Sequence, residues 1–123
     1  MIQQTLWIER KFHFEFPVGL YPCILERLRG APARLGLMTQ GLSEQVLTYK
    51  PAGKWSILEH IGHLDDLEEL HEGRIDDFRK QLKELRPADM RNKKTESAGH
   101  NARQLVELLI RFKERRTQFV RQL

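Results

Sequence analysis

The chain has 123 residues, of which 40% are hydrophobic and 31% charged, and its formal net charge is +4. This length suits a single domain, residues 1–123, and the composition is too apolar for a disordered chain. The excess of basic residues is small and interspersed with acidic ones, which argues against a nucleic-acid partner. The sequence has no signal-peptide core and no apolar run near the ~20 residues of a membrane span, so we expect a cytoplasmic protein without a membrane partner.

An extended arm is predicted near the N-terminus. Phe12, Phe14 and Phe16 alternate with His13 and Glu15, and a period of two is typical of extended backbone. No second strand pattern is present to pair with this segment. We therefore expect an arm that lays one aromatic face on the body of the domain.

A first long helix is predicted from Val18 to about Thr39, because apolar residues recur there at helical spacing. Gly30 and Pro32 are candidate break points within it. Cys23 is the single cysteine, so no disulfide can form within the chain, and its apolar neighbours predict a small buried thiol in a reducing compartment.

A second long helix follows a short helical turn in residues 42–47. Ser56, with Glu59 three residues later, forms a capping-box sequence that places the helix start at Ser56 or the next residue. The apolar stripe then continues to about Lys83. Gly73 in the middle of this helix indicates close packing against another segment.

Two polar residues, Glu68 and His71, interrupt the apolar stripe of this second helix. A polar group facing a core costs about 1–3 kcal/mol unless it is hydrogen-bonded. We interpret the two as a buried polar pair with a partner on another helix, and simple exposure through a gap stays open as the alternative. Arg116, near the apolar stripe of the third helix, would need a carboxylate if buried, and Glu68 is a candidate.

Residues 84–100 are polar, contain Pro87 and predict a long crossover between helices. A third long helix is predicted from about Asn101, and its apolar repeat still continues at Leu123 without a stop signal. These patterns together predict an all-α protein with three long helices.

The segment GKWSILEHIGHLDDLEEL, residues 53–70, resembles the DinB-like family of bacterial four-helix proteins, as do IERKF near the start and the long crossover. The family includes thiol transferases and metal-dependent hydrolases. The matching positions of its W-S-x-x-E-x-x-x-H-L-x-D run are Trp55, Ser56, Glu59, His63, Leu64 and Asp66. The resemblance implies an up-down bundle of which this chain holds three of the four helices, and we expect the C-terminal helix to be missing.

The resemblance also implies a divalent metal, zinc or nickel, held by three histidines and serving a small-molecule substrate. His63 corresponds to the ligand on the second helix, whereas the His-x-x-x-His pair of the fourth helix is absent. His100 precedes the third helix and corresponds to neither of these. Asp66, one turn after His63, suits a carboxylate that orients that imidazole, and an exposed acid on a charged helix is the equal alternative.

Judged from the residues alone, His60 and His63 form an i, i+3 pair that could share an ion, but they lack the better-known i, i+4 zinc spacing. We interpret His60 as a bystander. Because a catalytic zinc ordinarily has three protein ligands, we expect an enzyme site that is incomplete in this chain. The alternative is a non-catalytic helical module that forms a homodimer through an exposed apolar groove.

Overall fold

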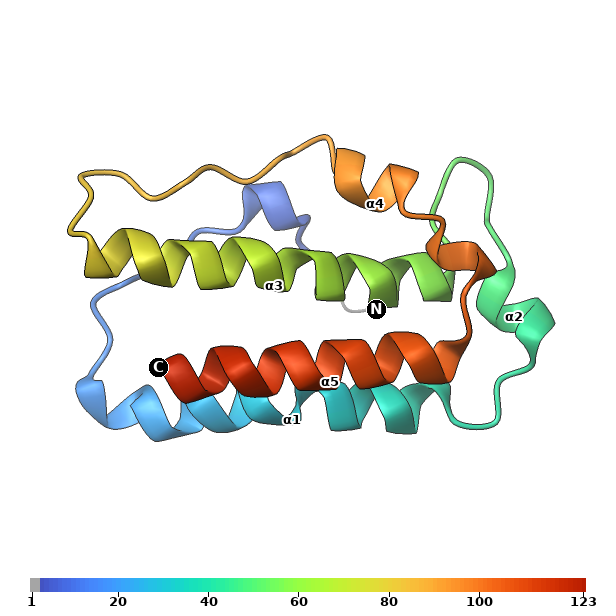
Figure 1. Cartoon of the computed structure of the whole chain (residues 1–123), viewed down its shortest axis with the longest axis horizontal. Helices are drawn as coiled ribbons and strands as arrows, with labels where there is room; N and C mark the ends of the chain where they lie inside the picture. The colour runs from blue at the N-terminus through green and yellow to red at the C-terminus, as the bar shows by residue number, and fades with distance from the viewer. Residues whose placement is uncertain (1–2) are drawn as a thin grey trace.

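The computed structural model describes residues 3–123, which fold into helices and contain no strand. The three long helices are α1 (Tyr21–Thr39), α3 (Ile57–Arg79) and α5 (Leu105–Gln122). Two short helices are α2 (Glu44–Thr48) and α4 (Lys93–Ser97), and 3-10 turns lie at Trp7–Glu9, Val18–Leu20 and His100–Ala102. The predicted all-α class is confirmed. In Figure 1 the long helices lie side by side, and α5 packs against both α3 and α1.

The start of α3 follows from its capping box, as predicted. The Ser56 hydroxyl accepts a hydrogen bond from the Glu59 backbone N–H at 3.1 Å, and the Glu59 carboxylate accepts one from the Ser56 N–H at 2.8 Å. The helix ends at Arg79, and the predicted end near Lys83 is wrong. Gln81 has a φ of 53°, in the left-handed region, which ends the helix before the apolar stripe of the sequence does.

Helix α1 runs through Pro32 without a break, so the candidate break points at Gly30 and Pro32 are wrong. Proline has no N–H and cannot bond the carbonyl four residues earlier, here that of Leu28. The Arg116 Nη1 atom donates a hydrogen bond to this carbonyl at 3.1 Å. A side chain from α5 therefore takes the place of the donor that proline lacks.

The hydrophobic core is small and lies between α2, α3 and α5. Its buried members are Leu47, Leu58, Ile61 and Leu108, with Ile57, Leu105 and Leu109 partly buried against them. The predicted burial of Cys23 is wrong, because this thiol is exposed on a part of α1 that the core does not reach. Several charged side chains are buried beside the core instead.

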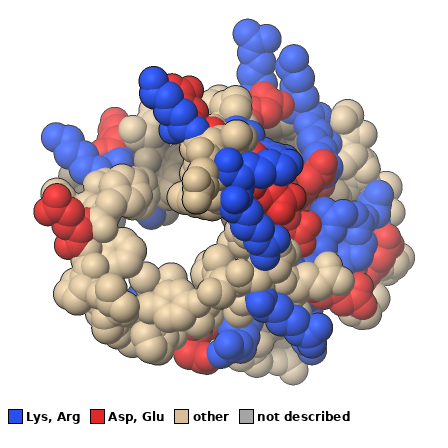
Figure 2. Space-filling view, turned by 60° about the vertical axis from the view of Figure 1, so that its left-hand side comes forward, with Lys and Arg blue, Asp and Glu red and all other residues tan. Residues whose placement is uncertain are grey.

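The N-terminal arm has no regular secondary structure apart from its 3-10 turns, but its predicted packing is wrong. Phe12, Phe14 and Phe16 are 53%, 83% and 50% exposed, so no aromatic face is laid on the body. The Trp7 and Phe12 rings contact each other instead, with centroids 5.1 Å apart. Figure 2 shows a hollow bordered mainly by uncharged side chains, so this side of the molecule is not closed by packing.

The polar crossover is docked on α3 at both of its ends and includes α4, which the sequence did not reveal (Figure 1). Arg86 donates to Asp77 from its backbone N–H at 2.8 Å and from Nε and Nη2 at 2.9 and 2.8 Å. A Cβ on Gly73 would lie 2.2 Å from Arg86 Nη1, which confirms that this glycine marks close packing. At the other end the His100 ring lies against Gly62 in the same way.

Candidate functional site

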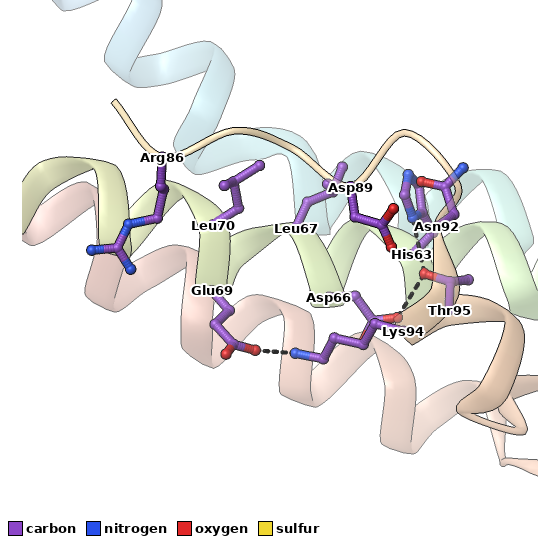
Figure 3. A pocket seen from close by; sticks show the side chains of 10 residues that line it. All are labelled: His63, Asp66, Leu67, Glu69, Leu70, Arg86, Asp89, Asn92, Lys94 and Thr95. Carbon is purple, nitrogen blue, oxygen red and sulfur yellow. Dashed lines mark hydrogen bonds and ion pairs between the residues drawn. The ribbon is translucent and has the colours of Figure 1, made fainter. Parts of the chain in front are cut away.

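A pocket of about 280 Å³ lies between α3 and the crossover. Its lining residues are His63, Asp66, Leu67, Glu69, Leu70, Arg86, Asp89, Asn92, Lys94 and Thr95. Figure 3 shows His63 beside Asp89 and Asn92 at one end and Arg86 at the other, with Leu67 and Leu70 between them. The pocket thus has an apolar middle and polar ends, which suits a small organic molecule with a polar head.

His63 belongs to a chain of hydrogen bonds that crosses from α3 to α4 and back. Its Nδ1 atom lies 3.0 Å from the Thr95 hydroxyl. That hydroxyl donates to Asp66 Oδ2 at 2.8 Å. The structure therefore brings His63 and Asp66 into one network, but the hydroxyl of Thr95 lies between them. Figure 3 draws these two contacts as dashed lines, one between His63 and Thr95 and the other between Thr95 and Asp66.

The surroundings of His63 favour its neutral form. Partial burial lowers the pKa of His63 below its ordinary value, Asp66 opposes this shift, and the nearby imidazoles His60 and His100 add to it. The Trp55 ring covers His63 with centroids 4.9 Å apart. A neutral imidazole keeps one nitrogen lone pair available, which is the form that binds a proton or a metal.

His100 is the second histidine of this network, and sequence reasoning did not assign it to the site. It is 2% exposed, and its Nε2 atom donates to Asp66 Oδ2 at 2.8 Å. A Cβ on Gly62 would lie 2.2 Å from the His100 ring, so glycine is what admits the imidazole here. A glycine in mid-helix was the available signal, because it predicts the close approach of another segment.

Whether these residues fit a metal can be judged from their donor atoms. In residues 3–123 no group of three or more His, Cys, Asp or Glu side chains is placed to hold an ion. His63 offers one nitrogen, since Nδ1 is engaged by Thr95 and no hydrogen bond within the described chain involves Nε2. His60 is exposed on α3, with its ring 5.4 Å from Trp55. The residues present therefore fit one ligand of a metal site and not a complete site.

The predicted buried polar pair lies between α3 and α5, apart from the pocket. Glu68 is 0% exposed, and Arg116 donates to its two oxygens from Nε at 2.9 Å and from Nη2 at 2.6 Å. Burial raises the pKa of Glu68, but hydrogen bonds from Arg116 and His71 outweigh this and leave the pKa below its ordinary value. His71 Nδ1 lies 3.3 Å from Glu68, but its side chain is 35% exposed, so full burial holds for Glu68 alone.

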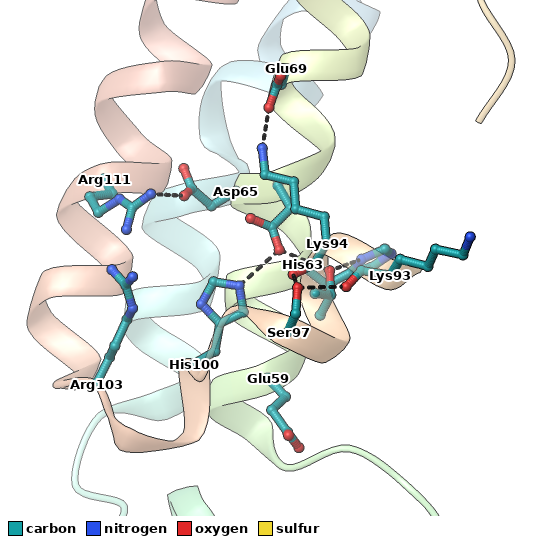
Figure 4. Close-up of polar contacts among 12 residues, drawn as sticks. Glu59, His63, Asp65, Glu69, Lys93, Lys94, Ser97, His100, Arg103 and Arg111 are labelled. Atoms are coloured by element: carbon teal, nitrogen blue, oxygen red, sulfur yellow. Dashed lines mark hydrogen bonds and ion pairs between the residues drawn. The ribbon is translucent and has the colours of Figure 1, made fainter. Parts of the chain in front are cut away.

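A second buried carboxylate, Asp65, was missed by sequence reasoning. Its side chain is 0% exposed, and it faces Arg111 at 3.1 Å and Arg115 at 3.5 Å. Figure 4 shows Arg111 directed from α5 toward this group. Neither carboxylate oxygen has a well-aligned hydrogen bond within the described residues, so the ion pairs alone compensate for its burial.

The chain was compared with protein-family models, with curated proteins and with solved structures, and it matches none of them.

Proposed function

We propose that this chain is a cytoplasmic DinB-like protein in which His63 is one ligand of a divalent metal, zinc or nickel. The family role is that of a metal-dependent hydrolase or thiol transferase acting on a small molecule. The observation that carries the proposal is the arrangement of His63. Its Nδ1 lies 3.0 Å from the Thr95 hydroxyl, no described residue hydrogen-bonds its Nε2, and the residue lines the pocket. Metal-binding histidines are typically oriented by a hydrogen bond from the nitrogen that does not bind the ion.

The proposed site needs ligands from a second polypeptide segment. One imidazole supplies one of the three protein ligands that a catalytic zinc ordinarily has. Among the described residues no third His, Cys, Asp or Glu is in place to complete a group. In this proposal the chain alone is the scaffold of a site and is inactive until the missing ligands are added.

A second candidate function, a helical module that forms a homodimer, is favoured by the exposed apolar side chains of the bundle. Val106 and Ile110 on α5 are 62% and 51% exposed, and Phe78 on α3 is 67% exposed. Exposed apolar side chains on two helices can be covered by a partner, and in this proposal a second copy of the chain covers them.

The test is the metal content per chain by elemental analysis, on protein never exposed to a nickel column, combined with the mass of the assembly in solution. We expect about one divalent ion per assembled site, lost in His63→Ala and kept in the matched control His60→Ala. An ion that survives in His63→Ala, or a protein without metal in every assembly state, would contradict the metal proposal. A dimer without metal would support the association module.

A further inference from the structure

Thr95 joins the pocket histidine to a buried carboxylate. Its hydroxyl oxygen lies 3.0 Å from His63 Nδ1 and 2.8 Å from Asp66 Oδ2. The same Asp66 oxygen accepts from His100 Nε2 at 2.8 Å. Thr95 is 4% exposed, so water does not compete freely for these contacts. Four side chains from α3, α4 and the turn after α4 thus form one continuous chain of contacts.

The direction of each hydrogen bond follows from counting protons. A carboxylate oxygen only accepts, so both the Thr95 hydroxyl and His100 Nε2 must donate to Asp66. A hydroxyl has a single proton, and Thr95 has given it to Asp66. The contact between Thr95 and His63 therefore needs a proton on His63 Nδ1. In a neutral imidazole with Nδ1 protonated, Nε2 carries the lone pair.

The packing around α4 fixes the position of the Thr95 hydroxyl. At the start of the helix, the Asp89 carboxylate accepts from the backbone N–H of Lys93 at 2.9 Å and of Arg91 at 3.0 Å. After the helix, the His100 ring lies against Gly62 on α3, where a Cβ would collide with it. Since both flanks of α4 are held, Thr95 cannot follow a rotating His63 without breaking other contacts.

We propose that Thr95 is the positioning residue of His63: it selects the tautomer with Nδ1 protonated and so presents the Nε2 lone pair at the pocket. Without the hydroxyl, the Nδ1 proton would lack an acceptor, and the imidazole would shift toward the tautomer with Nε2 protonated. That tautomer has no lone pair to offer at the pocket. The tautomer of His63 does not depend on the proposed function. The use of that tautomer to bind a divalent metal does rest on the proposed function.

The experiment is a long-range proton–nitrogen NMR spectrum of protein carrying nitrogen-15 histidine, recorded without metal at a pH where His63 is neutral. In the wild type we expect His63 Nδ1 to be protonated and Nε2 unprotonated. Thr95→Val should shift His63 toward the opposite tautomer, Thr95→Ser should restore the wild-type pattern, and the control Thr117→Val should leave it unchanged. Thr117 suits this purpose because its exposed hydroxyl donates to the Lys113 carbonyl of the same helix and bonds no other residue in the described part of the chain.

The proposal is overturned if His63 in the wild type carries its proton on Nε2, a result that needs no variant to fold. It is equally overturned if Thr95→Val, folded as judged by circular dichroism, keeps the wild-type tautomer.

A zinc titration of the same proteins separates this proposal from the proposed function. Loss of such an orienting partner typically weakens metal binding about 10–100-fold, and we expect that loss in Thr95→Val with recovery in Thr95→Ser. A wild type that binds no zinc in any assembly state but shows the expected tautomers would refute the metal proposal and leave the role of Thr95 standing. If the tautomer of His63 shifted in Thr95→Val but the zinc affinity stayed the same, the proposed link between the tautomer and metal binding would be refuted.

Discussion

Arg116 on α5 donates a hydrogen bond to the Leu28 carbonyl on α1 at 3.1 Å, at the point where Pro32 supplies no helical donor. Another edge of the same guanidinium donates two hydrogen bonds to Glu68 of α3. One side chain therefore ties all three long helices together. The same arginine thus compensates for the buried carboxylate on α3 and for the donor that Pro32 lacks in α1.

Removing either member of the buried ion pair between Arg116 and Glu68 should lower the stability of the fold, because the other charge stays buried without a partner. We expect Arg116→Met to lower the free energy of unfolding by about 3–5 kcal/mol, measured by urea denaturation. Glu68→Gln should also destabilise, and the double variant should lose less than the sum of the two.

The control for this pair is the more exposed ion pair between Arg103, just before α5, and Glu107 on α5, whose nitrogen and oxygen lie 3.1 Å apart. Breaking a solvent-accessible ion pair typically costs about 0.2–1 kcal/mol. If Arg116→Met cost no more than Arg103→Met, Arg116 could not be what ties the helices together.

Gly62 should be intolerant of a methyl group. A Cβ there would lie within 2.2–2.5 Å of three atoms of the His100 ring, so Gly62→Ala must displace the imidazole or shift the helix. We expect a loss of about 1–3 kcal/mol of unfolding free energy, measured by urea denaturation.

Gly36→Ala provides the control, since Gly36 is also within a helix and a Cβ there would meet no atom within 4 Å. In that variant alanine should stabilise by up to about 1 kcal/mol through helix propensity. Equal effects at the two glycines would mean that His100 does not occupy the place described.

The contact between Asp77 and Arg86 should make stability depend on pH in the acid range. Hydrogen bonds from the Arg86 side chain and backbone lower the pKa of Asp77 from 3.8 to about 2. Because the folded pKa is the lower one, the stabilisation is complete above the unfolded pKa of about 3.9 and is lost as the pH falls through about 2. The difference in unfolding free energy between wild type and Asp77→Asn should therefore be constant above about pH 5 and shrink toward pH 2.

The neighbouring Asp76 is the control for this experiment. It is exposed and has only a 3.4 Å contact with Arg79, so Asp76→Asn should differ little from wild type across the same range. A wild-type advantage over Asp77→Asn that persisted unchanged down to pH 2 would show that ionised Asp77 does not hold the crossover.

Local rules were enough for the parts of the fold that depend on neighbours in the sequence. The start of α3 follows from Ser56 and Glu59, and the burial of Glu68 against Arg116 follows from charged residues on apolar stripes. The predicted packing of the N-terminal arm was wrong because it depends on residues that are distant in the sequence. A period of two predicts an extended segment, but it does not say whether another surface exists for the aromatic side chains to cover.

The candidate site could be predicted only in part. His63 and Asp66 came from the resemblance, whereas Thr95 and His100 lie in a polar crossover whose composition gives no sign of docking. Asp65 and Asp66 are adjacent in the sequence, but neighbouring positions on a helix point about 100° apart. One therefore faces α5 and the other faces the crossover, a difference that depends on tertiary packing alone.

The most direct test of the metal proposal is to add zinc to the assembled protein carrying nitrogen-15 histidine and to follow the five histidines separately. The resonance of His63 Nε2 should move on binding while its Nδ1 stays protonated, and His13, His60 and His71 should be unchanged. A response at those exposed or half-exposed histidines with none at His63, or no response at all, would contradict the proposal that His63 is a metal ligand.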